Sequence, residues 1–171
     1  SGSFSSDSIN HKLVSYTADF AVNTETKVIR LSEFKAPIYT KEDENENGIP
    51  EPIKALRRLF DKADGFIISS PEYNSSLPAG FKNTLDWLSR MEGSIFQEKP
   101  VLLMSTSPGG RGGKSVLDHL SSIIPFWGAK LVGSFSLPKF YDNFTETGLS
   151  SELDSELKNL VTDFEKTLLD S

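Results

Sequence analysis

The amino-acid sequence predicts an α/β fold, a doubly wound parallel sheet with helices on both faces. Segments of helical periodicity alternate along the chain with short strand-like runs, which is typical of a mainly parallel sheet. The runs Gly65–Ser70 and Lys99–Ser107 have the apolar pattern of strands that are covered on both faces. No internal repeat and no second domain is visible. One domain over residues 1–171 is therefore expected.

Each expected element rests on its own pattern. Apolar side chains at helical spacing predict a first helix over residues 8–22: Ile9, Leu13, Tyr16 and Phe20. The acidic segment Tyr39–Gly48 is poor in apolar residues and predicts a solvated loop. The remaining expected elements are strands at Thr26–Leu31, Gly65–Ser70, Lys99–Ser107 and Ala129–Leu137, and helices at Pro50–Ala63, Pro78–Arg90, Lys114–Trp127 and Ser151–Leu169.

A five-stranded sheet of this kind needs one more strand than these residues supply. In the strand order 2-1-3-4-5, the first strand is near the centre of the sheet and would stand directly before Ser1. Without it, the neighbouring strands would lack a partner. The first strand is thus missing from this set, and we expect it upstream of Ser1 as roughly six to eight apolar residues, a typical strand length.

Composition narrows the function classes. The chain carries 24 acidic and 18 basic residues, a net charge of -6, which disfavours nucleic acid or an anionic membrane as the main partner. It has no cysteine, which excludes disulfides, thiolate metal sites and thiol nucleophiles. Neither a signal peptide nor a membrane-spanning apolar run is found, so a cytoplasmic location is expected.

Three loops would meet at the edge where open parallel sheets bind ligands. The first, Ser1–Ser8, is rich in serine and precedes a helix, whose N-terminal N–H groups suit a phosphate. A plain helix cap by Asp7 or Ser8 is the alternative. The second loop, Pro71–Leu77, offers Tyr73 and Asn74, which suit a planar heterocycle. The third, Pro108–Gly113, has four glycines that allow close approach of a ligand, or that make a flexible linker.

Other sites find less support. A nucleotide-binding P-loop ending at Gly113-Lys114-Ser115 would need glycine at position 108, where the chain has Pro108. His11 and His119 are the only histidines and stand on different expected helices, so no metal site is predicted. The acidic run Glu42–Glu46 lacks the ligand alternation of a calcium loop.

Three segments together resemble a known family. GSFSSDSIN, SPEYNSSLPAGFKNTLDWLSR and TSPGGRGGKS are similar, in order and spacing, to the motifs of the NADPH-dependent FMN reductase family, which has a flavodoxin-like fold. The resemblance covers nearly the whole chain, and the middle motif is the most specific. It implies a single flavodoxin-like FMN-binding domain over residues 1–171.

The resemblance also implies which residues hold the FMN. From the first loop, Ser3, Ser8 and Asn10 would bind the ribityl phosphate, helped by Ser5, with Ile9 as the middle residue of the Ser-x-Asn pattern. The residues that would border the flavin ring are Pro71, Glu72, Tyr73 and Asn74, and those that would close on its other side are Ser107, Gly109, Gly110 and Gly112.

One position departs from the family pattern. Many members have an arginine two residues after the loop serine, where this chain has Ser5. The sequence of the loop thus lacks a cation. Because charge-assisted hydrogen bonds are stronger than neutral ones, flavin affinity is expected to be lower or to depend more on backbone amides.

The activity implied is that of an NAD(P)H-dependent flavin or quinone reductase. FMN itself carries the chemistry, so no catalytic acid–base pair is expected. Hydride would pass from NAD(P)H to the flavin and electrons onward to a quinone, flavin or similar small acceptor, by ping-pong exchange. Arg111 would contact the dinucleotide phosphates, or else be solvated. The alternatives are an FMN electron carrier without its own nicotinamide site and a flavin-free binding module.

The resemblance further implies a homodimer or homotetramer. Phe126, Phe140 and Tyr141 could shape such an interface, a substrate wall or the core, and the sequence does not separate these roles.

Overall fold

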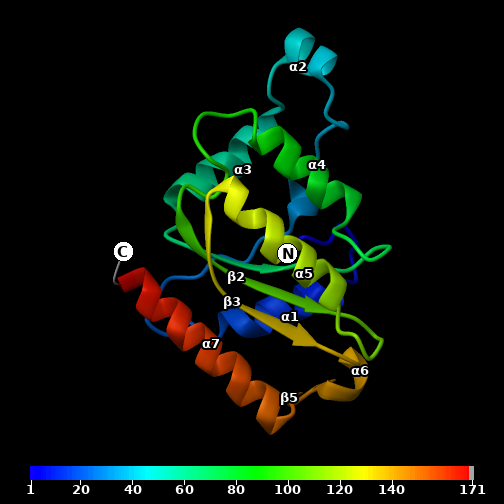
Figure 1. Cartoon of the computed structure of the whole chain (residues 1–171), viewed down its shortest axis with the longest axis vertical. Coiled ribbons are helices and arrows are strands. Elements are labelled where there is room, and N and C mark those ends of the chain that lie inside the picture. Colours follow the sequence, from blue (N-terminus) through cyan, green and yellow to red (C-terminus); the bar gives the residue numbers. More distant parts are fainter. Residues whose placement is uncertain (170–171) are drawn as a thin grey trace.

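In the computed structural model, which describes residues 1–169, two layers of helices enclose a parallel sheet (Figure 1). The sheet has the order β1-β2-β3, with β1 at Phe66–Ser69, β2 at Lys99–Thr106 and β3 at Ala129–Leu137. Both pairings are parallel, and Leu103 of β2 stands opposite Ile68 of β1 and Ser134 of β3. The predicted parallel α/β architecture is confirmed.

The central strand β2 shows why the sheet needs cover on both faces. Every residue from Pro100 to Thr106 is buried, and successive side chains of a strand point to opposite faces. Val101 and Leu103 enter one apolar cluster, and Leu102 and Met104 enter the other. The first cluster is covered by α3 (Glu51–Lys62), α4 (Ala79–Leu88) and α5 (Lys114–Ile123), and the second by α1 (Ile9–Ala18) and α7 (Ser151–Leu169).

The shorter elements complete the chain. They are the 3₁₀ turns η1 (Leu31–Glu33) and η2 (Ile124–Trp127), the helices α2 (Lys41–Asn47) and α6 (Phe140–Asn143), and the antiparallel pair β4 (Phe144–Thr145) and β5 (Gly148–Leu149). None of the helices within residues 1–169 is long and apolar enough to cross a membrane.

The first helix is shorter than expected. It ends at Ala18 rather than continuing to residue 22. Phe20 keeps its contact with Tyr16, an edge-to-face pair with ring centroids 4.9 Å apart. The tighter bonds from Phe20 N to Thr17 O and from Ala21 N to Ala18 O replace the α-helical ones. The apolar periodicity is therefore real, but the last part of it belongs to a turn.

The expected strand at Thr26–Leu31 is not formed. Thr26–Arg30 has no strand assignment, and its pairing is confined to Ser1, whose N donates to Ile29 O at 2.8 Å and whose O accepts from Leu31 N at 3.1 Å. Gly2 N donates to Ser69 O of β1 at 2.9 Å. Ser1 and Gly2 thus lie between residues 29–31 and β1. Two residues offer too few hydrogen bonds to define a strand beside them.

The acidic segment expected to be a loop contains α2. Thr40 Oγ accepts from Asp43 N at 3.0 Å and caps its start, and three carboxylates occupy the first turn, where the helix dipole favours them. Gly48, at φ 70°, ends the helix. Figure 1 shows α2 projecting away from the sheet. The threonine cap and the closing glycine are the local signals that the acidic composition conceals.

Candidate functional site

The three expected loops do come together at the carboxyl ends of the strands. Tyr73 Oη and Ser5 Oγ lie 3.2 Å apart and join the first and second loops. Val116 N, in the first turn of α5, donates to Glu72 Oε2 at 3.1 Å and joins the second loop to the helix that follows the third. The three loops therefore meet at the edge of the sheet where the sequence predicts them.

The side chain of Asn10 positions the start of α1. Its side chain is 1% exposed. Nδ2 donates to Thr106 O at 3.0 Å, and Oδ1 accepts from Thr106 N at 3.0 Å and from Ser69 Oγ at 2.9 Å. These bonds fix the start of α1 against the ends of β1 and β2. The expected contact of the Asn10 side chain with a phosphate stays a prediction, because these bonds use one of the two Nδ2 hydrogens.

The first loop combines a helix cap with open backbone donors. Ser8 Oγ accepts from His11 N at 3.2 Å, so Ser8 is the N-cap of α1. Ser3 is buried, and its Oγ accepts from Ser5 N at 3.2 Å, which curls the loop. The backbone N–H groups from Ser6 to Ile9 have no hydrogen-bond acceptor within residues 1–169. One loop therefore contains both the cap of α1 and backbone N–H groups that are open to a ligand.

The second loop presents Tyr73 on a tight turn. Tyr73 N donates to Ser76 O at 2.9 Å, and Ser76 N donates to Tyr73 O at 3.1 Å. The two residues between them, Asn74 and Ser75, have φ of 50° and 62°. Positive φ at both central positions characterises a type I′ turn, and asparagine tolerates it better than most residues. Tyr73 is 47% exposed, so its ring is available to a ligand.

Glu72 links the second loop to the start of α5, and its expected place beside a flavin ring stays a prediction. Its carboxylate accepts from Val116 N, at the positive end of the α5 dipole. Pro71 is buried where the chain leaves β1. Both residues fix the loop that carries Tyr73 and Asn74.

The third loop needs glycine for two different reasons. Gly112 has φ 58°, and a Cβ there would lie 2.7 Å from Pro138 N. A Cβ added at Gly110 would have no neighbour within 4 Å, so a ligand can approach the backbone of this residue. The N–H groups of Gly110 and Arg111 donate to nothing in the part of the chain that the structure describes. The loop is anchored by Phe140 N, which donates to Ser107 O at 3.0 Å, and by Lys139 N, which donates to Gly109 O at 2.9 Å.

Arg111 is held by a side chain of the helix that follows it. Nη2 donates to Ser115 Oγ at 2.7 Å, on an exposed surface. The guanidinium is therefore held in place without being buried, and it stays next to the open N–H groups.

Arg30 is the residue that sequence reasoning missed. Its Nη1 donates to Ser6 O at 3.2 Å, so a cation lies on the first loop although that loop's own sequence has none. The available signal was topological: residue 30 ends the segment expected to lie beside the first strand, and its side chain would reach the loop that follows that strand.

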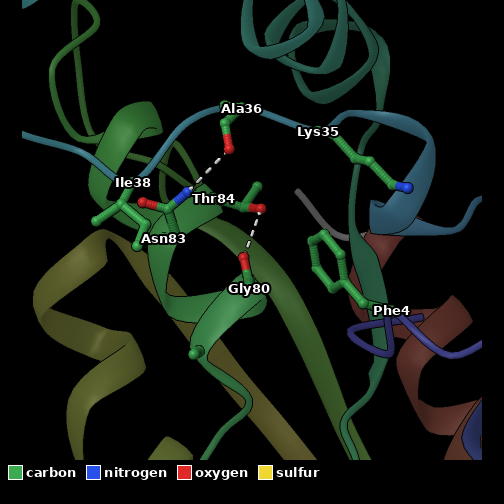
Figure 2. Close-up of a pocket in the computed structure, with 8 residues that line it drawn as sticks. Phe4, Lys35, Ala36, Ile38, Gly80, Asn83 and Thr84 are labelled. Atoms are coloured by element: carbon green, nitrogen blue, oxygen red, sulfur yellow. Dashed lines mark hydrogen bonds between the residues drawn. The ribbon is translucent and has the colours of Figure 1, made fainter. Parts of the chain in front are cut away.

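Two cavities adjoin the site. One of about 310 Å³ lies between the first loop and α4 (Figure 2), where the Phe4 ring faces Gly80 and Thr84 donates to Gly80 O at 2.9 Å. The other, of about 510 Å³, adjoins the second loop and is lined in part by Tyr73, Asn74 and His119. Both volumes are in the range of small-molecule pockets.

The histidines lie apart from each other in the fold. His119 Nδ1 is 3.0 Å from Ser76 Oγ, while burial, followed by the charge of Arg30, lowers the pKa of His11. Within residues 1–169 there is no group of three or more histidine, aspartate or glutamate side chains placed to hold a metal ion.

The model of the NADPH-dependent FMN reductase family matches residues 1–142, and those residues include all three loops. The chain belongs to this family. It is 40% identical over 96 residues to a quinone reductase of Escherichia coli, an alignment that covers 56% of this chain and 51% of that protein. It is 31% identical over 149 residues to an NADPH azoreductase of a Bacillus species, covering 84% and 75%.

A solved structure agrees with this assignment over the whole length. The flavoenzyme NAD(P)H:(acceptor) oxidoreductase FerB from Paracoccus denitrificans superposes with a TM-score of 0.78 at 25% identity, covering 99% of this chain and 94% of that one. In sequence, however, the alignment with the quinone reductase spans about half of that protein's length (51%).

The family implies a flavin, and the residues at the edge fit one. An anionic phosphate requires hydrogen-bond donors, which the N–H groups of residues 6–9 and the serine hydroxyls provide, and the carboxylate of Asp7 among them is paired with Lys12 at 2.8 Å. A flat ring requires an exposed aromatic side chain and unobstructed backbone, which Tyr73 and Gly110 provide.

Proposed function

We propose that this chain is an NAD(P)H-dependent flavoprotein oxidoreductase of the FMN reductase and quinone reductase type. Residues 1–171 would form one flavodoxin-like domain that binds FMN. The observation that carries the proposal is the row of open N–H groups from Ser6 to Ile9, placed beside the Tyr73 turn and the glycine loop. When bound, FMN would supply the redox chemistry, taking a hydride from NAD(P)H and delivering two electrons to a quinone, flavin or similar acceptor.

The protein's part in this reaction is to bind and orient. The first loop would hold the phosphate through Ser3, Ser5 and Ser8 and the amides around Ile9, while Asn10 keeps α1 in place behind them. Tyr73 and Asn74 would border one side of the ring.

The glycine loop would close the other side of the ring. Ser107, Gly109 and Gly112 shape this loop. The N–H groups of Gly110 and Arg111 would donate to the ring edge on which negative charge develops during reduction.

The strand order 2-1-3-4-5 is part of the proposal. Strands β1, β2 and β3 would be its positions 3, 4 and 5. Support comes from Ser1 and Gly2, which hydrogen-bond to residues 29–31 on one side and to Ser69 on the other. That is the arrangement expected for position 1 between positions 2 and 3.

Two finer expectations belong to the same proposal. Arg111 would contact the phosphates of NAD(P)H, supported by its exposed position beside the glycine loop. A homodimer or homotetramer would bury the side chains of Phe126 and Tyr141, which are 87% and 67% exposed, whereas Phe140 is 3% exposed and belongs to the core.

The similarity to other proteins points the same way. The relatives are named for reduction of quinones and of azo compounds, and the superposed structure for oxidation of NAD(P)H. Because the acceptors in those names differ, the acceptor class is proposed only as a small conjugated molecule.

The test is a spectroscopic titration of the purified protein. After loading with FMN and removal of excess, we expect retained flavin absorbance, bleaching by NADPH or NADH without air, and recovery on addition of a quinone. Loss of all flavin during desalting would contradict the proposal. Flavin that is retained but not bleached by either nicotinamide would favour the electron carrier instead.

A further inference from the structure

The first loop receives a cation from a distant part of the sequence. Arg30 Nη1 donates to Ser6 O at 3.2 Å, across 24 residues of chain. The backbone around Arg30 is fixed at the same place, because Ser1 bonds to Ile29 O at 2.8 Å and to Leu31 N at 3.1 Å. The guanidinium is thus anchored beside the loop by its own main chain.

The charge of Arg30 is not neutralised by an ion pair. Among residues 1–169, no carboxylate lies within 4.0 Å of its nitrogen atoms. The acidic side chains that share this region are Asp7 and Glu33. Asp7 is paired with Lys12 at 2.8 Å, so it does not neutralise the guanidinium.

Its neighbours respond to that charge. Burial lowers the pKa of His11, and the charge of Arg30 is the next cause. The pKa of Asp7 is lowered first by its hydrogen bond to Lys12, and in smaller part by Arg30. These two residues flank Ser8 and Ile9 in the sequence, so the positive potential of Arg30 extends along the row of open N–H groups.

We propose that Arg30 is the phosphate-binding cation of this chain, in the role for which the loop's own sequence offers only Ser5. The ligand group is the phosphomonoester dianion of FMN, so Arg30 determines preference for FMN over riboflavin. This inference rests on the proposed function. Arginine suits the task because its fork of donors can bind a carbonyl and a phosphate oxygen at once.

A purely structural role would have a different signature. If Arg30 only braced the first loop through Ser6 O, the loss of FMN affinity on its removal would not depend on salt concentration and would not be restored by Ser5→Arg. If it binds the phosphate, only ligands that carry the phosphate are affected.

The experiment compares FMN and riboflavin by quenching of flavin fluorescence, for wild type, Arg30→Ala, Arg30→Lys and the control Arg58→Ala. Arg58 is an exposed arginine on α3, and its replacement changes net charge equally. We expect Arg30→Ala to weaken FMN binding about tenfold, which is the order of one partly exposed charge-assisted hydrogen bond. The affinity for riboflavin should not change. Arg30→Lys should lose less FMN affinity than Arg30→Ala, and Arg58→Ala should lose none.

Two further measurements sharpen the result. Adding Ser5→Arg to Arg30→Ala should restore FMN affinity, since the cation returns to the loop from another position. Rising salt should weaken FMN binding more for wild type than for Arg30→Ala.

Equal losses for FMN and riboflavin, or an unchanged FMN affinity, would overturn the role of Arg30. These outcomes differ from failure of the proposed function itself, in which wild type would bind neither flavin. Unchanged riboflavin affinity of Arg30→Ala also serves as the control for correct folding.

Discussion

The two ends of the parallel sheet treat their polar groups in opposite ways. At the amino ends, the nearly buried Arg57 donates to Glu92 O at 2.8 Å, Ser94 O at 3.1 Å and Asp61 Oδ1 at 2.8 Å. Lys99 Nζ donates to Phe60 O at 2.8 Å. Polar groups at this end therefore find partners within the chain.

At the carboxyl ends, ordered donors are left without partners within residues 1–169. These donors are the N–H groups of residues 6–9 in the first loop, which Arg30 contacts through Ser6 O, and those of Gly110 and Arg111 in the third loop. A backbone group without a protein partner must be satisfied by water or by a ligand. One end of the sheet thus uses its polar groups for contacts within the chain, and the other keeps donors available for the ligand that we propose.

Replacing Asn10 should lower the free energy of unfolding more than any other substitution considered. It tests whether the carboxyl ends of the strands also contribute stability. Asn10 lies at the carboxyl ends of the strands, but its buried amide makes three hydrogen bonds within the chain. We expect Asn10→Ala to lower the free energy of unfolding by about 3 kcal/mol, at roughly 1 kcal/mol for each of three hydrogen bonds. Urea unfolding would measure it, with Asn159→Ala on the exposed face of α7 as control. A loss below about 1 kcal/mol would show that the three bonds do not secure α1.

Arg57→Ala should come next. Its three backbone and carboxylate partners would lose a buried donor, which we expect to lower the free energy of unfolding by about 2 kcal/mol. Flavin affinity should not change, because the lost bonds are at the opposite end of the sheet. The neighbouring Arg58→Ala should cost less than about 0.5 kcal/mol, as is usual for an exposed ion pair. A loss of flavin affinity in Arg57→Ala would contradict the separate roles of the two ends of the sheet.

Ser8→Ala should have a smaller effect, and it should lower both the free energy of unfolding and the affinity for FMN. Loss of an N-cap typically lowers the free energy of unfolding by about 1 kcal/mol. Because Ser8 is also a proposed phosphate contact, FMN affinity should fall more than riboflavin affinity. Thermal unfolding and flavin titration measure the two effects, and Ser8→Thr, which retains the hydroxyl, should preserve both. A stability change without any change in FMN affinity would restrict Ser8 to capping.

The smallest expected effect is on how the free energy of unfolding depends on pH, and it involves a carboxylate near the amino ends of the strands. Glu165 is buried, which opposes its ionisation, but hydrogen bonds from Asn23 and Thr24 outweigh burial and hold its pKa below the ordinary value of a glutamate. A folded pKa below the unfolded value stabilises the protein above that value, and the contribution is lost as pH falls through the folded pKa.

We therefore expect Glu165→Gln to be less stable than wild type at about pH 7, by less than about 1 kcal/mol, and the difference to shrink at about pH 3. Urea unfolding at the two pH values would measure it. A difference that grows on acidification would contradict the sign of this linkage.

The fold could be predicted where burial alone decides it. The strand Ala129–Leu137 and the helix Ser151–Leu169 have the bounds that the sequence predicted. The strand predicted at Thr26–Leu31 is not formed, because a strand also requires a partner along its length. The apolar pattern of the segment cannot reveal whether that partner is present. The helix α2 was missed because the acidic composition of Tyr39–Gly48 outweighed the signal of its Thr40 cap.

The site could be predicted as a place more readily than as a set of contacts. Loop positions between strands and helices were enough to bring the three loops to one edge. The directions of polar side chains were not, since Asn10 and Glu72 turn toward backbone groups of other elements. Arg30 was missed because its relation to Ser6 depends on the fold rather than on spacing along the chain.

The bond from Val116 N to Glu72 Oε2 has a consequence for how two loops are held relative to each other. It couples the loop that carries Tyr73 to the helix that carries the glycine loop at its start. Movement of either loop away from the other would separate a carboxylate from a helix N-terminus, which is unfavourable. One carboxylate therefore ties the position of the Tyr73 turn to the start of α5, through a bond that the folded chain makes by itself.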